Sequence, residues 1–134
     1  MTARPLALVA VLVFLAGCGG GDSDDGGSVE ETGRVAASGP ASAQTASLDM
    51  NDRLQFVPNV VTAQPGGLTL TLKNVGKVPH NLVFDDTSLP STDTINGGRT
   101  ETLRLTFNAT GTFRFTCTFH PGMDGQVVVE AAGQ

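Results

Sequence analysis

Soft metal ligands lie close together near the C-terminal end of the chain. Residues 117–123 read Cys-Thr-Phe-His-Pro-Gly-Met, although the 134-residue chain has only two cysteines, two histidines and three methionines. Cys117, His120 and Met123 stand at three-residue intervals, so one tight loop can turn their donor atoms toward a single point. Thiolate, imidazole and thioether together favour copper over magnesium, calcium or manganese. The alternative is a plain turn between two strands that happens to contain polarisable side chains.

The segments that must position this loop have the pattern of short β-strands. Apolar residues alternate with polar ones in segments 68–72 and 103–107, as expected for strands with one buried face. No segment from residue 46 onward sustains the periodicity of a helix, and Pro, Gly and Asn residues separate the alternating runs. This pattern predicts an all-β domain, an antiparallel sandwich or a small barrel. Further strands are expected at residues 46–50, 59–63, 81–84, 112–117 and 126–130.

The strand pattern also indicates how a second histidine can reach Cys117. Alternation in segment 112–117 places Cys117 on the same face as two phenylalanines, which points the thiol into the apolar interior. His80 follows a turn and opens the strand expected at 81–84. In a sandwich, the start of one strand and the end of an antiparallel neighbour lie at the same end of the fold. Two histidines, one cysteine and a weakly bound methionine form the donor set of blue-copper electron-transfer sites.

Segment 113–130, together with Pro79, His80 and Asn81, resembles the plastocyanin/azurin-type cupredoxins, and the Cys-x-x-His-x-x-Met spacing is most similar to amicyanin. The resemblance covers essentially the whole domain. It implies a small antiparallel Greek-key β-sandwich that binds one type 1 copper ion per chain. It also implies a division of roles among the site residues. The equatorial ligands would be His80, Cys117 and His120, and the axial ligand would be Met123.

The same resemblance assigns roles to the neighbours of these ligands. Asn81 matches the family asparagine whose hydrogen bonds help to hold the loop around the thiolate, and Thr118 matches the small hydroxyl residue after the cysteine. Phe119 departs from the family pattern, because proline is common at this position. We expect Phe119, Pro121 and Gly122 to surround His120 as an apolar patch that faces redox partners, a donor and an acceptor.

The N-terminal segment has the pattern of an exported lipoprotein. Residues 1–17 contain an apolar run shorter than the roughly 20 residues of a membrane-spanning helix. The run ends in Leu-Ala-Gly-Cys, which resembles the lipobox of prokaryotic lipoproteins, with Cys18 as the lipidated residue. Residues 18–45 are rich in Gly, Ser, Ala and acidic residues, and we expect them to form a flexible tether to a domain at 46–134. The protein would then face the periplasm or the extracellular side of a membrane.

Composition narrows the classes of partner and function. The chain has a formal net charge of −5, with five of its 13 acidic residues in the expected tether, and it has no basic patch with interleaved aromatics that would indicate nucleic-acid binding. A multicopper enzyme would need further histidines beyond the two present. We therefore expect a monomeric electron carrier and not an enzyme. Two alternatives stay open: a protein for copper delivery or storage, which would use the same donors, and a structural sandwich without metal.

Overall fold

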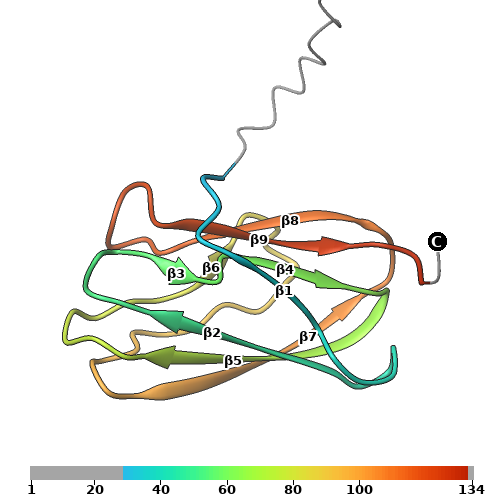
Figure 1. The fold of residues 1–134 in the computed structure, drawn as a ribbon, viewed down its shortest axis with the longest axis horizontal. Coiled ribbons are helices and arrows are strands. Elements are labelled where there is room, and N and C mark those ends of the chain that lie inside the picture. Colours follow the sequence, from blue (N-terminus) through green and yellow to red (C-terminus); the bar gives the residue numbers. More distant parts are fainter. Residues whose placement is uncertain (1–28, 133–134) are drawn as a thin grey trace, which may run out of the picture.

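Alternating apolar side chains form nine strands in residues 29–132, the part of the chain that the computed structural model describes. The strands make two sheets that face each other (Figure 1). The described residues contain no helix, and therefore none that is long and apolar enough to cross a membrane. The predicted all-β sandwich is confirmed. One sheet has the order β1 (Arg34–Ala36), β4 (Val60–Ala63), β9 (Asp124–Val129), β8 (Gly111–Thr116) and β6 (Val83–Phe84); the other has β3 (Phe56–Val57), β2 (Gln44–Met50), β5 (Gly66–Asn74) and β7 (Thr100–Phe107).

The two sheets are mixed, which corrects the expectation of purely antiparallel pairing. β2 runs parallel to β5, and β4 runs parallel to both β1 and β9, whereas β5 with β7 and β8 with β9 are antiparallel. Parallel neighbours need a crossover connection. The chain makes one between β2 and β5 by passing through β4 in the opposite sheet. From β3 to β8, successive strands alternate between the sheets, as in a Greek-key sandwich.

The core lies between the sheets and contains the inward-facing residues of both. Phe115 at its centre is fully buried, and its ring packs edge-on against Phe56 and Phe84 at centroid distances of 5.0 and 5.6 Å. Gly125 on β9 lets this ring approach, since a Cβ there would lie 2.4 Å from the ring carbons of Phe115. The predicted packing of Phe113 and Phe115 follows the expected face, because Phe113 packs on Phe107 at 4.8 Å.

Residues 29–45 do not behave as the predicted tether. β1 pairs with β4 in register Val35↔Val61, and β2 already begins at Gln44. Thr32 is also fixed, because its backbone N–H donates to the Asn59 side chain at 2.8 Å and its hydroxyl donates to the Phe56 carbonyl at 2.6 Å. The sandwich therefore includes these residues, and the domain boundary predicted at residue 46 is wrong. The expected signal peptide, Cys18 and the first part of the tether lie outside the described residues.

Candidate metal centre

His80 is held at one end of the sandwich by backbone and ring contacts. Its backbone exchanges two hydrogen bonds with Ile95, at 3.1 and 2.7 Å, in an isolated bridge three residues before β6 begins. The side chain is fully buried, and ring atom Nε2 lies 2.9 Å from the carbonyl oxygen of Asn51. An oxygen acceptor at Nε2 requires the proton on that nitrogen. The Nδ1 lone pair is therefore free to bind a metal.

Residues 117–123 form a closed loop between β8 and β9. The Cys117 N–H donates to the carbonyl of Met123 at 2.9 Å, and inside the loop the N–H groups of His120 and Met123 donate to the carbonyls of Cys117 and His120. Gly122 has φ +85°, a left-handed conformation that side chains rarely adopt. β8 ends at Thr116, one residue before the predicted strand end, so Cys117 directly follows the strand; its thiol is buried as expected.

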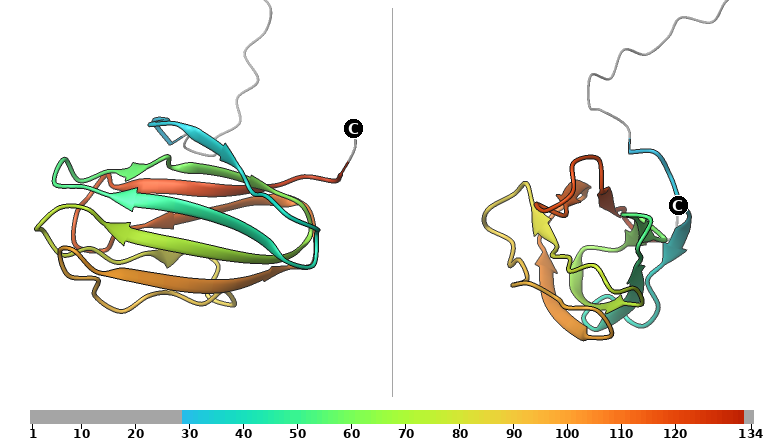
Figure 2. Two further views of the ribbon diagram at one scale, coloured as in Figure 1. Left: turned by 60° about the horizontal axis from the view of Figure 1, so that its bottom comes forward. Right: turned by 90° about the vertical axis from the view of Figure 1, so that its left-hand side faces the viewer.

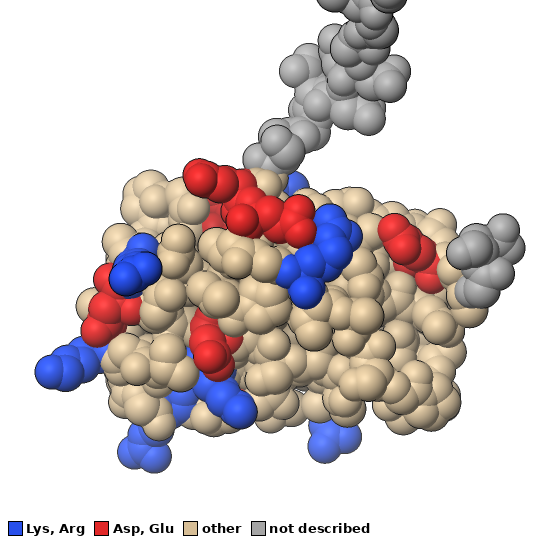
Figure 3. Space-filling view, in the orientation of Figure 1, with Lys and Arg blue, Asp and Glu red and all other residues tan. Residues whose placement is uncertain are grey.

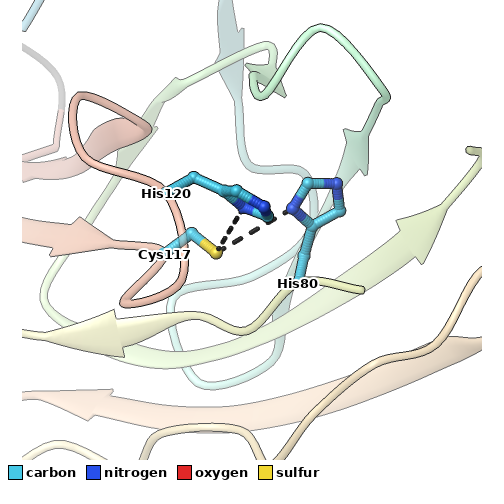
Figure 4. A group of neighbouring side chains, drawn as sticks. All are labelled: His80, Cys117 and His120. Atoms are coloured by element: carbon cyan, nitrogen blue, oxygen red, sulfur yellow. Dashed lines mark hydrogen bonds between the residues drawn. The ribbon is translucent and has the colours of Figure 1, made fainter. Parts of the chain in front are cut away.

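Three predicted ligands converge at this end of the sandwich, which we call the metal end (Figure 4). Cys117 Sγ lies 3.8 Å from His80 Nδ1 and 3.4 Å from His120 Nδ1, and the three donor atoms all lie within 4.8 Å of one another. One metal ion with bonds of about 2.3 Å to sulfur and about 2.0–2.1 Å to nitrogen could bridge gaps of this size. The spacing and the soft donor set therefore fit a copper ion. Met123 is buried at the end of the same loop, and its axial role stays a prediction.

Two reciprocal hydrogen bonds connect the segments that contribute His80 and Cys117. The Asn81 side-chain amide donates to the Thr118 hydroxyl at 2.7 Å, and its carbonyl oxygen accepts the Thr118 backbone N–H at 2.8 Å. The structure thus brings together the pair that the family resemblance singled out. Because each residue directly follows a candidate ligand, these bonds set the separation of the two ligand-bearing segments.

Burial also tunes the protonation of the site. Removal from water lowers the pKa of His80, the nearby His120 lowers it further, and the hydrogen bond to Asn51 opposes both effects. A lowered pKa favours the neutral imidazole, which is the form that binds a metal. The site is therefore biased toward the protonation state that copper requires.

Exposed apolar side chains lie at the surface of the metal end. Phe119, Pro121 and Gly122 are exposed, as predicted, and the half-buried His120 ring lies 6.4 Å from the Phe119 ring. In the part of the chain that the structure describes, three large apolar side chains are exposed, and all three belong to loops at this end. They are Leu54, Val75 and Phe119, with exposed fractions of 40%, 60% and 47%. Local sequence did not identify Leu54 or Val75, because only the fold brings their loops beside residues 117–123.

The loop between β2 and β3 was also missed as part of the site. Its Asn51 carbonyl fixes the His80 ring, while its Asp52 carboxylate accepts hydrogen bonds from the N–H groups of Lys77 and Val78 at 2.7 and 3.0 Å. The Asn51 side chain accepts the N–H groups of Arg53 and Gln55, as asparagine often does in turns. Asn-Asp was a visible turn signal, but nothing in it indicated contact with a histidine 29 residues later.

Comparison with known proteins agrees with this geometry. A family model described as a cupredoxin-like domain matches residues 6–129. Amicyanin of Paracoccus versutus is 30% identical over 133 residues, covering 96% of each chain. Plastocyanin of Vicia faba is 38% identical over 90 residues, 57% of this chain and 88% of the plastocyanin. Reduced auracyanin from Roseiflexus castenholzii shares the fold with a TM-score of 0.57 at 23% identity, covering 64% of this chain and 96% of its own. The chain belongs to the cupredoxin family of copper electron-transfer proteins, and its cofactor is one type 1 copper ion.

Proposed function

We propose that this cupredoxin carries single electrons between two redox proteins at the outer face of a membrane, to which lipid on Cys18 anchors it. The ligands would be His80, Cys117, His120 and Met123. The observation that most supports the proposal is the combination of a fixed, buried donor set with an exposed apolar surface beside His120. Copper, when bound, supplies the one-electron couple. The protein supplies the positions of the donors and the surface on which a partner docks.

Fixed donors favour electron transfer because few atoms must move. Asn51 holds the His80 ring, Asn81 holds Thr118 beside Cys117, and the closed loop fixes His120. Donors held by the protein keep nearly the same positions in both oxidation states, which keeps the cost of reorganisation small. A site for copper delivery has the opposite need, since it must release the ion.

The apolar rim supports exchange with a protein partner at the metal end. Leu54, Val75 and Phe119 come from three separate loops, and exposed apolar side chains grouped in this way normally mark an interaction site. A small interface suits brief redox encounters. A partner seated on this rim would lie beside His120, which is the most exposed of the three grouped donors. We propose that the electron passes at the His120 ring.

Visible absorption and electron paramagnetic resonance of the Cu(II)-loaded protein test the ligand set. We expect an intense blue band and a narrow copper hyperfine splitting. The Cys117→Ser substitution should abolish the colour even if copper still binds. The Met123→Leu substitution should keep the colour and shift the reduction potential. Met50→Leu, at another buried methionine, is the control for loss of a core thioether.

The outcomes separate electron transfer from copper delivery. A protein that binds only Cu(I) and shows neither colour nor a reversible redox wave would support delivery or storage. A colourless Cu(II) adduct with a wide hyperfine splitting would contradict the type 1 site. An unchanged spectrum in Cys117→Ser would contradict the ligand assignment.

The anchor requires a separate measurement. If Cys18 is lipidated, the covalent chain lets residue 29 lie at most about 40 Å from the lipid, because an extended residue spans about 3.3–3.6 Å. We expect the mature protein to fractionate with membranes and to show the added mass of acyl chains on its first residue. Cys18→Ser should release it into the soluble fraction. Membrane association that persists without acylation would contradict the anchor.

A further inference from the structure

Exposed cations project from three loops of the metal end. Arg53 lies in the β2–β3 connection, Lys77 lies between β5 and β6, and Arg99 directly precedes β7. The three side chains are exposed. Figure 3 shows blue side chains at the left-hand end of the molecule, where β2 and β5 finish, with one red group among them and further red side chains along the upper edge. These three loops therefore contribute cations to a chain whose formal net charge is −5.

The three loops form one continuous surface, which we call the basic sector (residues 51–55, 75–79 and 96–99). The Asp52 carboxylate joins the first loop to the second through the N–H groups of Lys77 and Val78. Gly97 lies so close to the second loop that a Cβ would stand 2.7 Å from the Gly76 carbonyl oxygen. Figure 2 (right) looks onto these loops, which lie around the end of the sandwich. The cations are therefore held on a common surface.

Within the residues of this sector the three cations outnumber the carboxylates. Its only carboxylate is Asp52, which is turned toward two backbone N–H groups. Glu30, Glu31 and Asp124 border the first loop of the sector, because they line a hollow of about 470 Å³ together with Asn51, Arg53, Leu54 and Gln55. Glu31 is paired there with Arg34 at 3.1 Å. Another carboxylate, Asp93, follows Thr92, whose backbone N–H and hydroxyl are hydrogen-bonded to the backbone of Leu82.

We propose that the basic sector docks an acidic surface of the redox partner, with the apolar rim against the partner's electron-exit site. This inference rests on the proposed electron-transfer function and adds the charge of the partner. Complementary charge speeds encounter and orients the two proteins, even where the total charges are alike. An anionic membrane is the weaker match, because clusters that bind such lipids usually contain about 4–8 cations. Three cations beside an apolar rim suit a brief protein contact.

Small charged oxidants test the local charge directly. The copper-loaded, reduced full-length protein would be oxidised in a stopped-flow instrument by anionic hexacyanoferrate(III) and, separately, by cationic tris(phenanthroline)cobalt(III). If the basic sector governs encounter, the rate with the anion falls as ionic strength rises, and the rate with the cation increases. The net charge of the protein predicts the opposite signs. Opposite signs would therefore overturn the proposal.

A charge reversal with a matched control locates the effect. Lys77→Glu should lower the rate with hexacyanoferrate(III) at low salt by about threefold or more. Arg104→Glu makes the same charge change at an exposed position in the middle of β7 and should alter the rate much less. Equal effects of the two variants would contradict a local surface. The reduction potential of each variant would be measured as well, so that a change in driving force is not read as a change in encounter.

The remaining outcomes are distinct. No electron transfer to either oxidant would contradict the proposed function itself. Electron transfer to both oxidants, with salt dependences opposite to those expected, would contradict only the proposal that the partner's surface is acidic. Vesicles containing phosphatidylglycerol test the lipid alternative, with Cys18→Ser in every variant to remove the acyl chain. Binding at about 0.1 M salt that is lost in Lys77→Glu would assign the sector to a membrane instead.

Discussion

At the scale of single residues, two asparagines organise the metal end. Asn51 fixes the tautomer and direction of the His80 ring through its carbonyl, and Asn81 ties His80's segment to that of Cys117. Neither asparagine offers a soft donor to copper. Their bonds fix where the donors stand, so their loss should change the properties of the site as well as its stability.

The Asn81–Thr118 pair allows a graded test. Asn81→Ala removes both hydrogen bonds and leaves the Thr118 N–H without its partner, which should cost about 1–3 kcal/mol of the free energy of unfolding. Thr118→Val removes only the hydroxyl and should cost less. We expect the reduction potential and the visible band to shift in the same order, as measured by voltammetry and absorption. Equal effects of the two variants, or an unchanged potential in Asn81→Ala, would contradict a positioning role.

Asp52 makes the stability of the metal end depend on pH. Hydrogen bonds from the N–H groups of Val78 and Lys77 lower the pKa of its carboxyl below the usual value. Such a group contributes stability above its unfolded pKa of about 3.9 and loses this contribution as pH falls through the lowered folded pKa. Asp52→Asn should therefore be less stable than the wild type near pH 7, and the difference should shrink in acid. Urea unfolding of the copper-free proteins measures it.

A comparison with Asp86 sharpens this prediction. Hydrogen bonds from Ser88 also lower the pKa of Asp86, in the loop that follows β6 and apart from the basic sector. Asp86→Asn should show the same direction of pH dependence, but only Asp52→Asn should also alter the salt dependence of electron transfer. A stability difference that stays constant from neutral to acidic pH would contradict the assigned cause.

At the scale of elements, much of the sandwich could be predicted from alternation, because in a strand with one buried face every second side chain is apolar. β5, β7, β8 and β9 follow this pattern over six to nine residues. The sequence did not predict β1 and β3, and the reason is physical. With three and two residues, respectively, they are too short to show a period, and β1 pairs at an edge where polar residues suffice. The parallel register of β2 with β5 is a long-range property that no local pattern contains.

The residues of the site show the same difference between what local sequence contains and what only the fold brings together. Spacing and residue type sufficed to bring Cys117 and His120 together as candidate ligands, because they share one loop; the role of Met123 stays a prediction. His80 required a sandwich as an intermediate step, and the family resemblance supplied Asn81 and Thr118. Asn51, Leu54 and Val75 could not be found, since their role arises only where separate loops meet at the metal end.

Asn59 joins the N-terminal segment to the end of the metal loop, and its removal tests whether residues 29–33 belong to the fold. Its buried side chain accepts the Thr32 N–H and donates to the carbonyls of Glu30 and Asp124 at 2.7 and 3.1 Å. Asn59→Ala should lower the free energy of unfolding by about 2–4 kcal/mol. It should also speed hydrogen exchange at the Thr32 amide. Urea unfolding and exchange measured by NMR check both effects.

The controls for Asn59 use the same chemistry elsewhere. Asn108→Ala, in the exposed turn between β7 and β8, should leave stability almost unchanged. Asn59→Asp keeps the acceptor for Thr32 but places a buried carboxylate oxygen against two carbonyl oxygens, so near pH 7 it should be at least as destabilising as Asn59→Ala. If exchange at Thr32 is unaffected in Asn59→Ala, the segment is held by other contacts.

At the scale of the whole molecule, the site is built by the fold before a metal arrives. His80 is fully buried and bonded at its backbone and its ring, and the loop 117–123 closes through its own hydrogen bonds. His80 and Cys117 come from segments far apart in the sequence, so copper connects parts of the sandwich that the chain connects only distantly. Copper should therefore add stability without changing the strand structure.

Removal of copper tests this view of the molecule. A ligand present at 100 times its dissociation constant adds about 2.7 kcal/mol to the stability of the folded state. For a domain of this size the melting temperature should fall by roughly 10–20 °C when copper is removed. Far-ultraviolet circular dichroism should stay the same, because the sheets persist. In Cys117→Ser the copper-dependent increase should be smaller, since the thiolate is lost. A copper-free protein that loses its β-sheet signal would contradict a preformed site and would place the metal among the determinants of the fold.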